Sequence, residues 1–156
     1  MYVNRFLGRS YVDGIADCYG LVRDVYKVEY GIQLRNYARP LGFDHEGLNL
    51  LAENFQREGF EALNIPISLL EPGDGLLFQL ASDLPNHVGI HVDQGRFLHH
   101  LYRKSSSQDF LDLRWQRRLV SIVRHPDVTE FNRNNHKPVD ALSLLPPHLR
   151  RQAIVL

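Results

Sequence analysis

The apolar residues in the first sixty positions follow two helical patterns. Within residues 17–30, apolar side chains recur at the three-to-four-residue spacing that gives a helix one apolar face. Asp17 is suited to cap the start of this helix, and Gly31 is suited to end it. Residues 45–58 repeat the spacing before Gly59 interrupts it. The sequence therefore predicts two helices in the N-terminal part of the chain.

Beyond Gly59 the apolar runs become short and are separated by turn-forming residues. The segments 71–75, 82–86 and 93–95 contain the Pro, Gly, Asp and Asn residues typical of turns. Helices followed by hairpin-connected strands indicate an α+β fold, with the N-terminal helices packed on an antiparallel sheet of about five strands. The predicted strands are residues 60–65, 76–80, 87–92, 96–102 and 118–125.

The last 31 positions, residues 126–156, differ in composition and pattern from the rest of the chain. Residues 126–140 are mostly polar and residues 141–156 are apolar only in short bursts, without helical or strand periodicity. We therefore expect one domain over residues 1–125 and a C-terminal extension over 126–156 that docks on the domain or on partner proteins.

Charge and cysteine content narrow the classes of function. The chain has 156 residues with 18 basic and 18 acidic side chains, so its formal net charge is zero, and bulk charge gives no reason to expect nucleic-acid binding. A single cysteine excludes an internal disulfide, so the domain can fold in a reducing compartment. We expect neither a secretion signal nor a membrane-spanning segment, because no apolar run of the required length is present. A local basic patch remains possible from Arg114, Arg117, Arg118 and Arg124.

Cys18 is predicted to lie in the first turn of the first helix. The unpaired N–H groups and the dipole at a helix start stabilise a thiolate, which is the nucleophilic form of cysteine. A buried thiol that only fills space in the core is the alternative. The helix by itself does not decide between them.

Two histidines are predicted to face each other across a hairpin. A turn centred near Asp93 places His87 opposite His99, on the same face of the sheet. His91 shares this face and is a competitor as general base, whereas His100 should face away. A zinc site built from the three histidines of this face is a rival interpretation, but their spacing fits no common closed site. We therefore expect no metal and no cofactor.

Four motifs carry a resemblance to a known family. "DCYGLV", "PGDGLLF", "NHVGIHV" and "GRFLHH" occur in this order within residues 11–124. Together they resemble the NlpC/P60 superfamily of cell-wall cysteine peptidases, which have a papain-like core. The stretches around them are similar to the members encoded among phage tail genes.

The resemblance implies a role for five residues. Cys18 matches the nucleophile, His87 the base that forms a thiolate–imidazolium pair with it, and His99 the residue that orients the base. Tyr11 matches a tyrosine near the oxyanion position. Tyr19 is expected to line the cleft beside the thiol.

The resemblance also implies a substrate and a setting. The family acts on peptidoglycan stem peptides, typically at a bond between D-glutamate and a diamino acid. The phage branch implies a protein made in the host cytoplasm, assembled with other tail-tip proteins and acting at the host cell wall from the virion tail tip. Two alternatives remain open: a structural tail-tip component with little activity, and an exported effector amidase.

Overall fold

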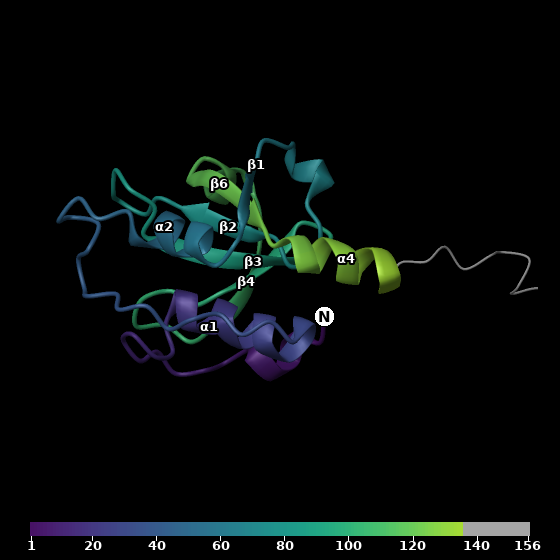
Figure 1. The fold of residues 1–156 in the computed structure, drawn as a ribbon. Helices are drawn as coiled ribbons and strands as arrows, with labels where there is room; N and C mark the ends of the chain where they lie inside the picture. Colours follow the sequence, from purple (N-terminus) through teal and green to yellow (C-terminus); the bar gives the residue numbers. More distant parts are fainter. Residues whose placement is uncertain (136–156) are drawn as a thin grey trace, which may run out of the picture.

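The computed structural model describes residues 1–135 and confirms the α+β fold. Its centre is a six-stranded antiparallel sheet with the strand order β1-β6-β2-β3-β4-β5. Helix α1 packs on β3 and β4 on one side of this sheet (Figure 1). The sheet has one strand more than the sequence predicts.

The first helix begins and ends where the sequence predicts. Helix α1 spans Cys18–Val25 and continues as a π-helical turn over Tyr26–Tyr30. Gly31 ends it in the left-handed conformation, with φ of 71°, which glycine adopts without steric cost. The second predicted helix is shorter than expected, because residues 41–47 form turns. The remaining helical segments are η1 (Val3–Phe6), α2 (Leu50–Arg57), η3 (Ile67–Leu69), α3 (Leu113–Gln116) and α4 (Pro126–Asn135).

Each of the five predicted strands is present, with shifted ends. The sequence analysis missed the short polar edge strand β5, whose side chains are mostly half-buried or exposed. The strands are β1 (Glu61–Leu63), β2 (Gly75–Phe78), β3 (His87–Asp93), β4 (Arg96–His99), β5 (Ser107–Phe110) and β6 (Leu119–Arg124).

The sheet separates two apolar clusters. Alternate residues of β3 point to opposite faces, as strand geometry requires. Val88 and Ile90 face α1 and pack in the larger cluster with Leu21 and Val25. The opposite face carries a smaller cluster of Leu76, Phe78, Phe97, Leu111 and Ile122.

The first ten residues of the predicted C-terminal extension form helix α4, which the sequence pattern did not indicate. Val128 and Asn132 are buried, and the Phe131 ring packs edge-on against Tyr30 at 5.1 Å between ring centroids. This part of the extension therefore packs on the domain. The rest of it, residues 136–156, lies outside the described residues.

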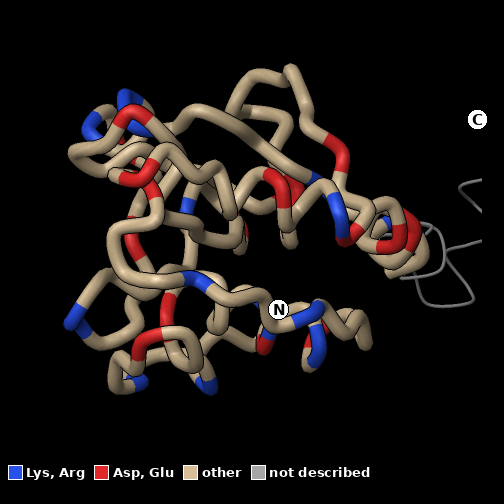
Figure 2. The backbone as a smooth tube through the Cα atoms, turned by 60° about the vertical axis from the view of Figure 1, so that its left-hand side comes forward, with Lys and Arg blue, Asp and Glu red and all other residues tan. Residues whose placement is uncertain are grey.

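Charged residues of both signs are distributed over the same parts of the fold. Figure 2 shows basic and acidic positions interspersed along the backbone. Arg124, one member of the possible basic patch, pairs with Asp74 and Glu71 at 2.6 and 2.8 Å. Within residues 1–135, none of the helices has the length and hydropathy that crossing a bilayer requires.

Candidate active site

Cys18 is the first residue of α1, and two local features hold it there. The Asp17 side chain caps the helix by accepting a hydrogen bond from the Gly20 N–H at 2.7 Å. A Cβ atom on Gly20 would lie 2.1 Å from the carbonyl oxygen of Ile15, so only glycine fits at this position. The Asp-Cys-x-Gly motif therefore follows from helix capping and from close backbone packing.

A buried ion pair reinforces the helix start. Arg39 Nε lies 2.9 Å from Asp17 Oδ2, with both side chains almost fully buried. Arg39 also donates to the Gly14 carbonyl at 3.0 Å, which ties the loop before α1 to the segment after it. The Asp17 carboxylate therefore lies one residue from Cys18, and the Arg39 guanidinium balances its negative charge.

The surroundings of Cys18 favour the protonated thiol in the free protein. Burial, followed by the charge of Asp17, raises the pKa of the Cys18 thiol to about 12. Hydrogen bonding by the backbone of Val88 and Tyr19 and the charge of Arg39 act in the opposite direction and lower this pKa. The contact with Val88 also places the sulfur beside the strand that carries His87.

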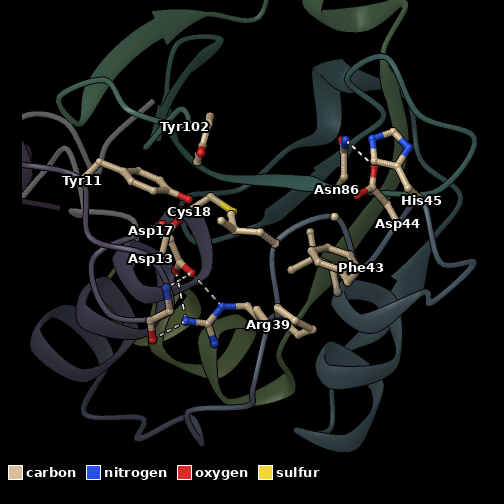
Figure 3. Close-up of a pocket in the computed structure, with 15 residues that line it drawn as sticks. Tyr11, Asp13, Asp17, Cys18, Arg39, Phe43, Asp44, His45, Asn86 and Tyr102 are labelled. Carbon is tan, nitrogen blue, oxygen red and sulfur yellow. Dashed lines mark hydrogen bonds and ion pairs between the residues drawn. The ribbon is translucent and has the colours of Figure 1, made fainter.

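The sulfur opens into a cavity of about 370 Å³ between α1 and the loop that follows it. Figure 3 shows the Cys18 sulfur and the hydroxyl end of Tyr11 turned towards the middle of this cavity. Burial raises the pKa of Tyr11, as do the nearby carboxylates of Asp17 and Asp13, so its hydroxyl remains a proton donor. The other polar and aromatic side chains of the cavity wall are Asp13, Arg39, Phe43, Asp44, His45, Asn86 and Tyr102.

Tyr19 does not line this cavity, so the prediction for this residue is wrong. Its side chain is fully buried and packs edge-on against Phe55 at 5.5 Å. The Arg39 guanidinium covers the ring at 4.8 Å. One residue along an α-helix turns the side chain by about 100°, which directs Tyr19 into the core while Cys18 faces the cavity.

His87 and His99 are in contact, although they are not directly opposed. Their Nε2 and Nδ1 atoms lie 3.1 Å apart. The Cα partner of His99 is Gly89, so the predicted register is wrong by two residues. The hairpin turns at Gln94 and Gly95 instead of at Asp93, which moves the pairing by three residues, and a bulge between His91 and Asp93 takes one residue back. A shift of two residues preserves the face of the sheet, and the rings therefore still meet.

The two histidines lie on the face of the sheet opposite to α1. The Trp115 ring packs against both, at 6.1 Å from His87 and 4.9 Å from His99 between centroids. Phe97 packs on His99 at 4.7 Å. His87 is the first residue of β3, one residue before Val88, whose backbone lowers the pKa of the Cys18 thiol.

Both histidines are held in the neutral form. Burial, followed by repulsion from His99 and His100, lowers the pKa of His87 to about 3. Burial also lowers the pKa of His99, against the opposing effect of the Asp109 carboxylate. His99 Nε2 lies 3.2 Å from both Asp109 Oδ2 and Ser107 Oγ on β5.

The other candidates of the sequence analysis lie elsewhere. His91 is buried opposite Phe97, and its Nδ1 has no hydrogen-bond partner among the described residues. His100 faces away from His99, as predicted, and packs edge-on against Tyr11 at 5.3 Å. Over residues 1–135, no group of three or more His, Cys, Asp or Glu side chains has an arrangement that could hold a metal ion.

Several residues of the site gave no signal in the sequence. Arg39 and Asp44 come from an aperiodic loop, and Asp109 comes from the strand that the analysis missed. Trp115, the only tryptophan of the chain, lies in a four-residue helix. Their roles depend on tertiary packing, which local patterns do not report.

Comparison with known proteins agrees with the resemblance seen in the motifs. The sequence profile of the NlpC/P60 family matches residues 7–124. Tail tip assembly protein K of Escherichia phage lambda is 35% identical over 123 residues, which cover 79% of this chain and 60% of that protein. Tail tip assembly protein K of Escherichia phage N15 is 32% identical over 127 residues, covering 78% and 50%. The chain thus spans between half and three-fifths of the length of these relatives.

Solved structures confirm the fold. An NLP/P60 family protein similar to lipoprotein from Staphylococcus aureus has a TM-score of 0.52 at 24% identity and covers 77% of this chain and 37% of its own. An NlpC/P60 family protein from Bacillus cereus has a TM-score of 0.51 at 18% identity, covering 77% and 36%. The NlpC/P60 domain of the peptidoglycan hydrolase SagA has a TM-score of 0.50 at 20% identity, covering 77% and 90%.

Proposed function

Because the chain belongs to the NlpC/P60 family, we propose that it is a cysteine hydrolase that cleaves peptide bonds in the stem peptides of peptidoglycan. The observation that carries the proposal is the position of Cys18. It begins a capped helix, opens into a cavity and lies beside the strand on which His87 contacts His99. A nucleophile, a base and an orienting group are the parts that acyl transfer requires.

The first half of the reaction forms a thioester. His87 Nδ1 takes the proton from the Cys18 thiol, and the sulfur attacks the carbonyl carbon of the scissile bond. The backbone N–H of Cys18 and the Tyr11 hydroxyl donate to the oxyanion of the tetrahedral intermediate. His87 then gives its proton to the leaving amine as the C–N bond breaks.

The second half releases the acid. His87 takes a proton from a water molecule, which attacks the thioester, and the proton returns to the sulfur as the C–S bond breaks. His99 holds the His87 ring in the productive orientation throughout, because it bonds the nitrogen that does not react.

The neutral forms of Cys18 and His87 favour a second candidate, a structural component of a tail tip with little activity. Burial opposes both the thiolate and the imidazolium. In the hydrolase interpretation, the ion pair forms only when substrate fills the cavity, and the N–H groups of Val88 and Tyr19 then stabilise the thiolate. The two candidates therefore differ in whether the site turns over.

We place the hydrolase at a phage tail tip, where it would act on the host cell wall during entry. This location rests on the relatives, which are tail tip assembly proteins of phages lambda and N15. The partners would be other tail-tip proteins.

Digestion of purified sacculi tests the activity. The wild-type protein should release soluble peptides, and mass spectrometry of these peptides identifies the bond that is cut. Cys18→Ala and His87→Ala should each lower the rate by about 10³-fold or more, because each removes a group that takes part in proton transfer or attack. Lys27→Ala, a change on the exposed surface after α1, should not alter the rate.

The same variants separate the two candidates in a particle. If wild-type protein folds but releases nothing from sacculi, and virions that carry Cys18→Ala infect as well as wild type, the protein is a structural component. Reduced infection by Cys18→Ala virions that assemble normally would support the hydrolase.

A further inference from the structure

Asp109 is the outermost member of a chain of hydrogen bonds that leads through His99 to His87. His99 Nδ1 bonds His87 Nε2 at 3.1 Å, and His99 Nε2 faces Asp109 Oδ2 at 3.2 Å. The His99 side chain is fully buried, so its ring cannot turn to other partners. The pairing of β4 with β5 sets Ser107 opposite His99 and Asp109 opposite Phe97, on the face that carries both histidines.

We propose that Asp109 is a positioning residue that selects the tautomer of both histidines and thereby leaves Nδ1 of His87 free to act as the base. The proposal rests on the proposed function for its catalytic meaning. The tautomers themselves can be measured without any substrate.

The direction of each hydrogen bond from His87 to Asp109 follows from which of the groups can donate. A carboxylate only accepts hydrogen bonds, so His99 Nε2 must carry the proton that lies towards Asp109. A neutral imidazole has one N–H, and His99 Nδ1 is then an acceptor. His87 must therefore donate from Nε2, which leaves the lone pair of its Nδ1 unused by the chain.

Ser107 can favour the opposite tautomers of His99 and His87. Its hydroxyl lies 3.2 Å from the same His99 nitrogen and can donate to it. Every proton of the chain would then be reversed, with His99 Nδ1 donating to His87 and the His87 proton on Nδ1. In that state His87 cannot accept the thiol proton. The carboxylate wins this competition because a hydrogen bond to a charged acceptor is stronger than one between neutral groups.

The surroundings of Asp109 separate it from substrate. Its side chain is 44% exposed and lines a second cavity together with Arg114, Trp115 and Arg118, while Cys18 lines the first. Besides these groups, His100 lowers the pKa of both His87 and His99, and the two arginines share the wall of the second cavity with Asp109. Asp109 thus acts only through His99.

Nitrogen-15 NMR of the histidine rings tests the tautomers directly. In wild type, both His87 and His99 should be protonated at Nε2. Asp109→Ala should shift both protons towards Nδ1, because His99 Nε2 then loses its acceptor-only partner and keeps, among the described residues, the Ser107 hydroxyl, which can donate to it. The rate of peptide release from sacculi should fall by about 10³-fold, since a histidine in the wrong tautomer cannot serve as the base.

The double variant Asp109→Ala/Ser107→Ala provides the decisive comparison. Without either partner, His99 and His87 can adopt the productive tautomers for part of the time. The double variant should therefore release peptides from sacculi about tenfold faster than Asp109→Ala alone. A residue with a merely structural role would not regain activity when a second contact is lost. Asp93→Ala, which removes an exposed carboxylate at the neighbouring turn, should keep the wild-type rate and tautomers.

Two outcomes would overturn the proposal: unchanged tautomers in Asp109→Ala, or a double variant no faster than the single one. An inactive wild type would instead defeat the proposed function, because the NMR result does not depend on turnover.

Discussion

Around Cys18 the site is open and held by main-chain contacts, whereas around His87 and His99 it is closed and held by side chains. The sulfur faces a cavity and receives N–H groups from Val88 and Tyr19. The histidines are buried under Trp115 and Phe97. The proposed nucleophile thus faces a cavity, whereas the proposed base is buried among side chains.

This difference separates two tasks within one site. On the Cys18 side, the backbone of Val88 and Tyr19 interacts with the sulfur and leaves the adjacent cavity free, which in the proposed function is the space for substrate. An aromatic shell fixes the rings and keeps both histidines neutral, because it removes the water that would stabilise an imidazolium. Substitutions on the two sides should therefore fail in different ways.

The largest effect is expected from the aromatic shell. Phe97 is fully buried between Gly89, His99 and Trp115, so Phe97→Ala should lower the free energy of unfolding by about 3–5 kcal/mol through a cavity in the smaller cluster. Chemical denaturation measures this change. Phe110→Ala on the adjacent strand is the matched control and should cost less than about 0.5 kcal/mol, because its side chain is 67% exposed. Equal losses for the two variants would show that the shell does not hold the histidine side together.

A smaller effect is expected at the start of α1. Gly20→Ala pushes a methyl group against the Ile15 carbonyl and should destabilise the fold by about 2–3 kcal/mol. Activity should fall further than stability explains, because the displaced helix start carries Cys18. Gly47→Ala is the control: it meets open space but has φ of +78°, so only backbone strain of about 1 kcal/mol is expected. If the two variants have the same thermal midpoint and activity, close packing does not position the sulfur.

The same contrast explains what could be predicted from the sequence. The start of α1 depends on residues within four positions of one another, namely the Asp17 cap, Cys18 and Gly20, and local patterns contain that information. It was also predictable that His87 and His99 lie on the same face of the sheet, because a register error of two residues leaves the face of each side chain unchanged.

What local patterns could not supply were the contacts between distant segments. The pairing is shifted by the two-residue turn at Gln94 and Gly95, which both have positive φ, and by the bulge that precedes it beside Asp93. Asp109 lies on an edge strand whose polar sequence lacks the apolar alternation of a half-buried strand. Tyr19 follows Cys18 in sequence, but its side chain points into the core and not into the cavity, which is a consequence of helix geometry.

The smallest effect is expected when the pH is lowered, and it reports on the histidine side of the site alone. The pKa of His87 is lowered from 6.5 to about 3 on folding, so the unfolded chain binds a proton more readily between these values and stability must fall as pH decreases through this window. His87 alone should remove about 1.4 kcal/mol of stability at a pH of about 5.5 relative to a pH of about 8. His87→Gln should flatten this dependence in urea titrations across that range, whatever it does to stability at neutral pH. His45→Gln, which replaces an imidazole with 75% exposure, should retain the wild-type slope. A wild-type slope in His87→Gln would mean that the histidine side is open to water, and the contrast between the two sides of the site would no longer hold.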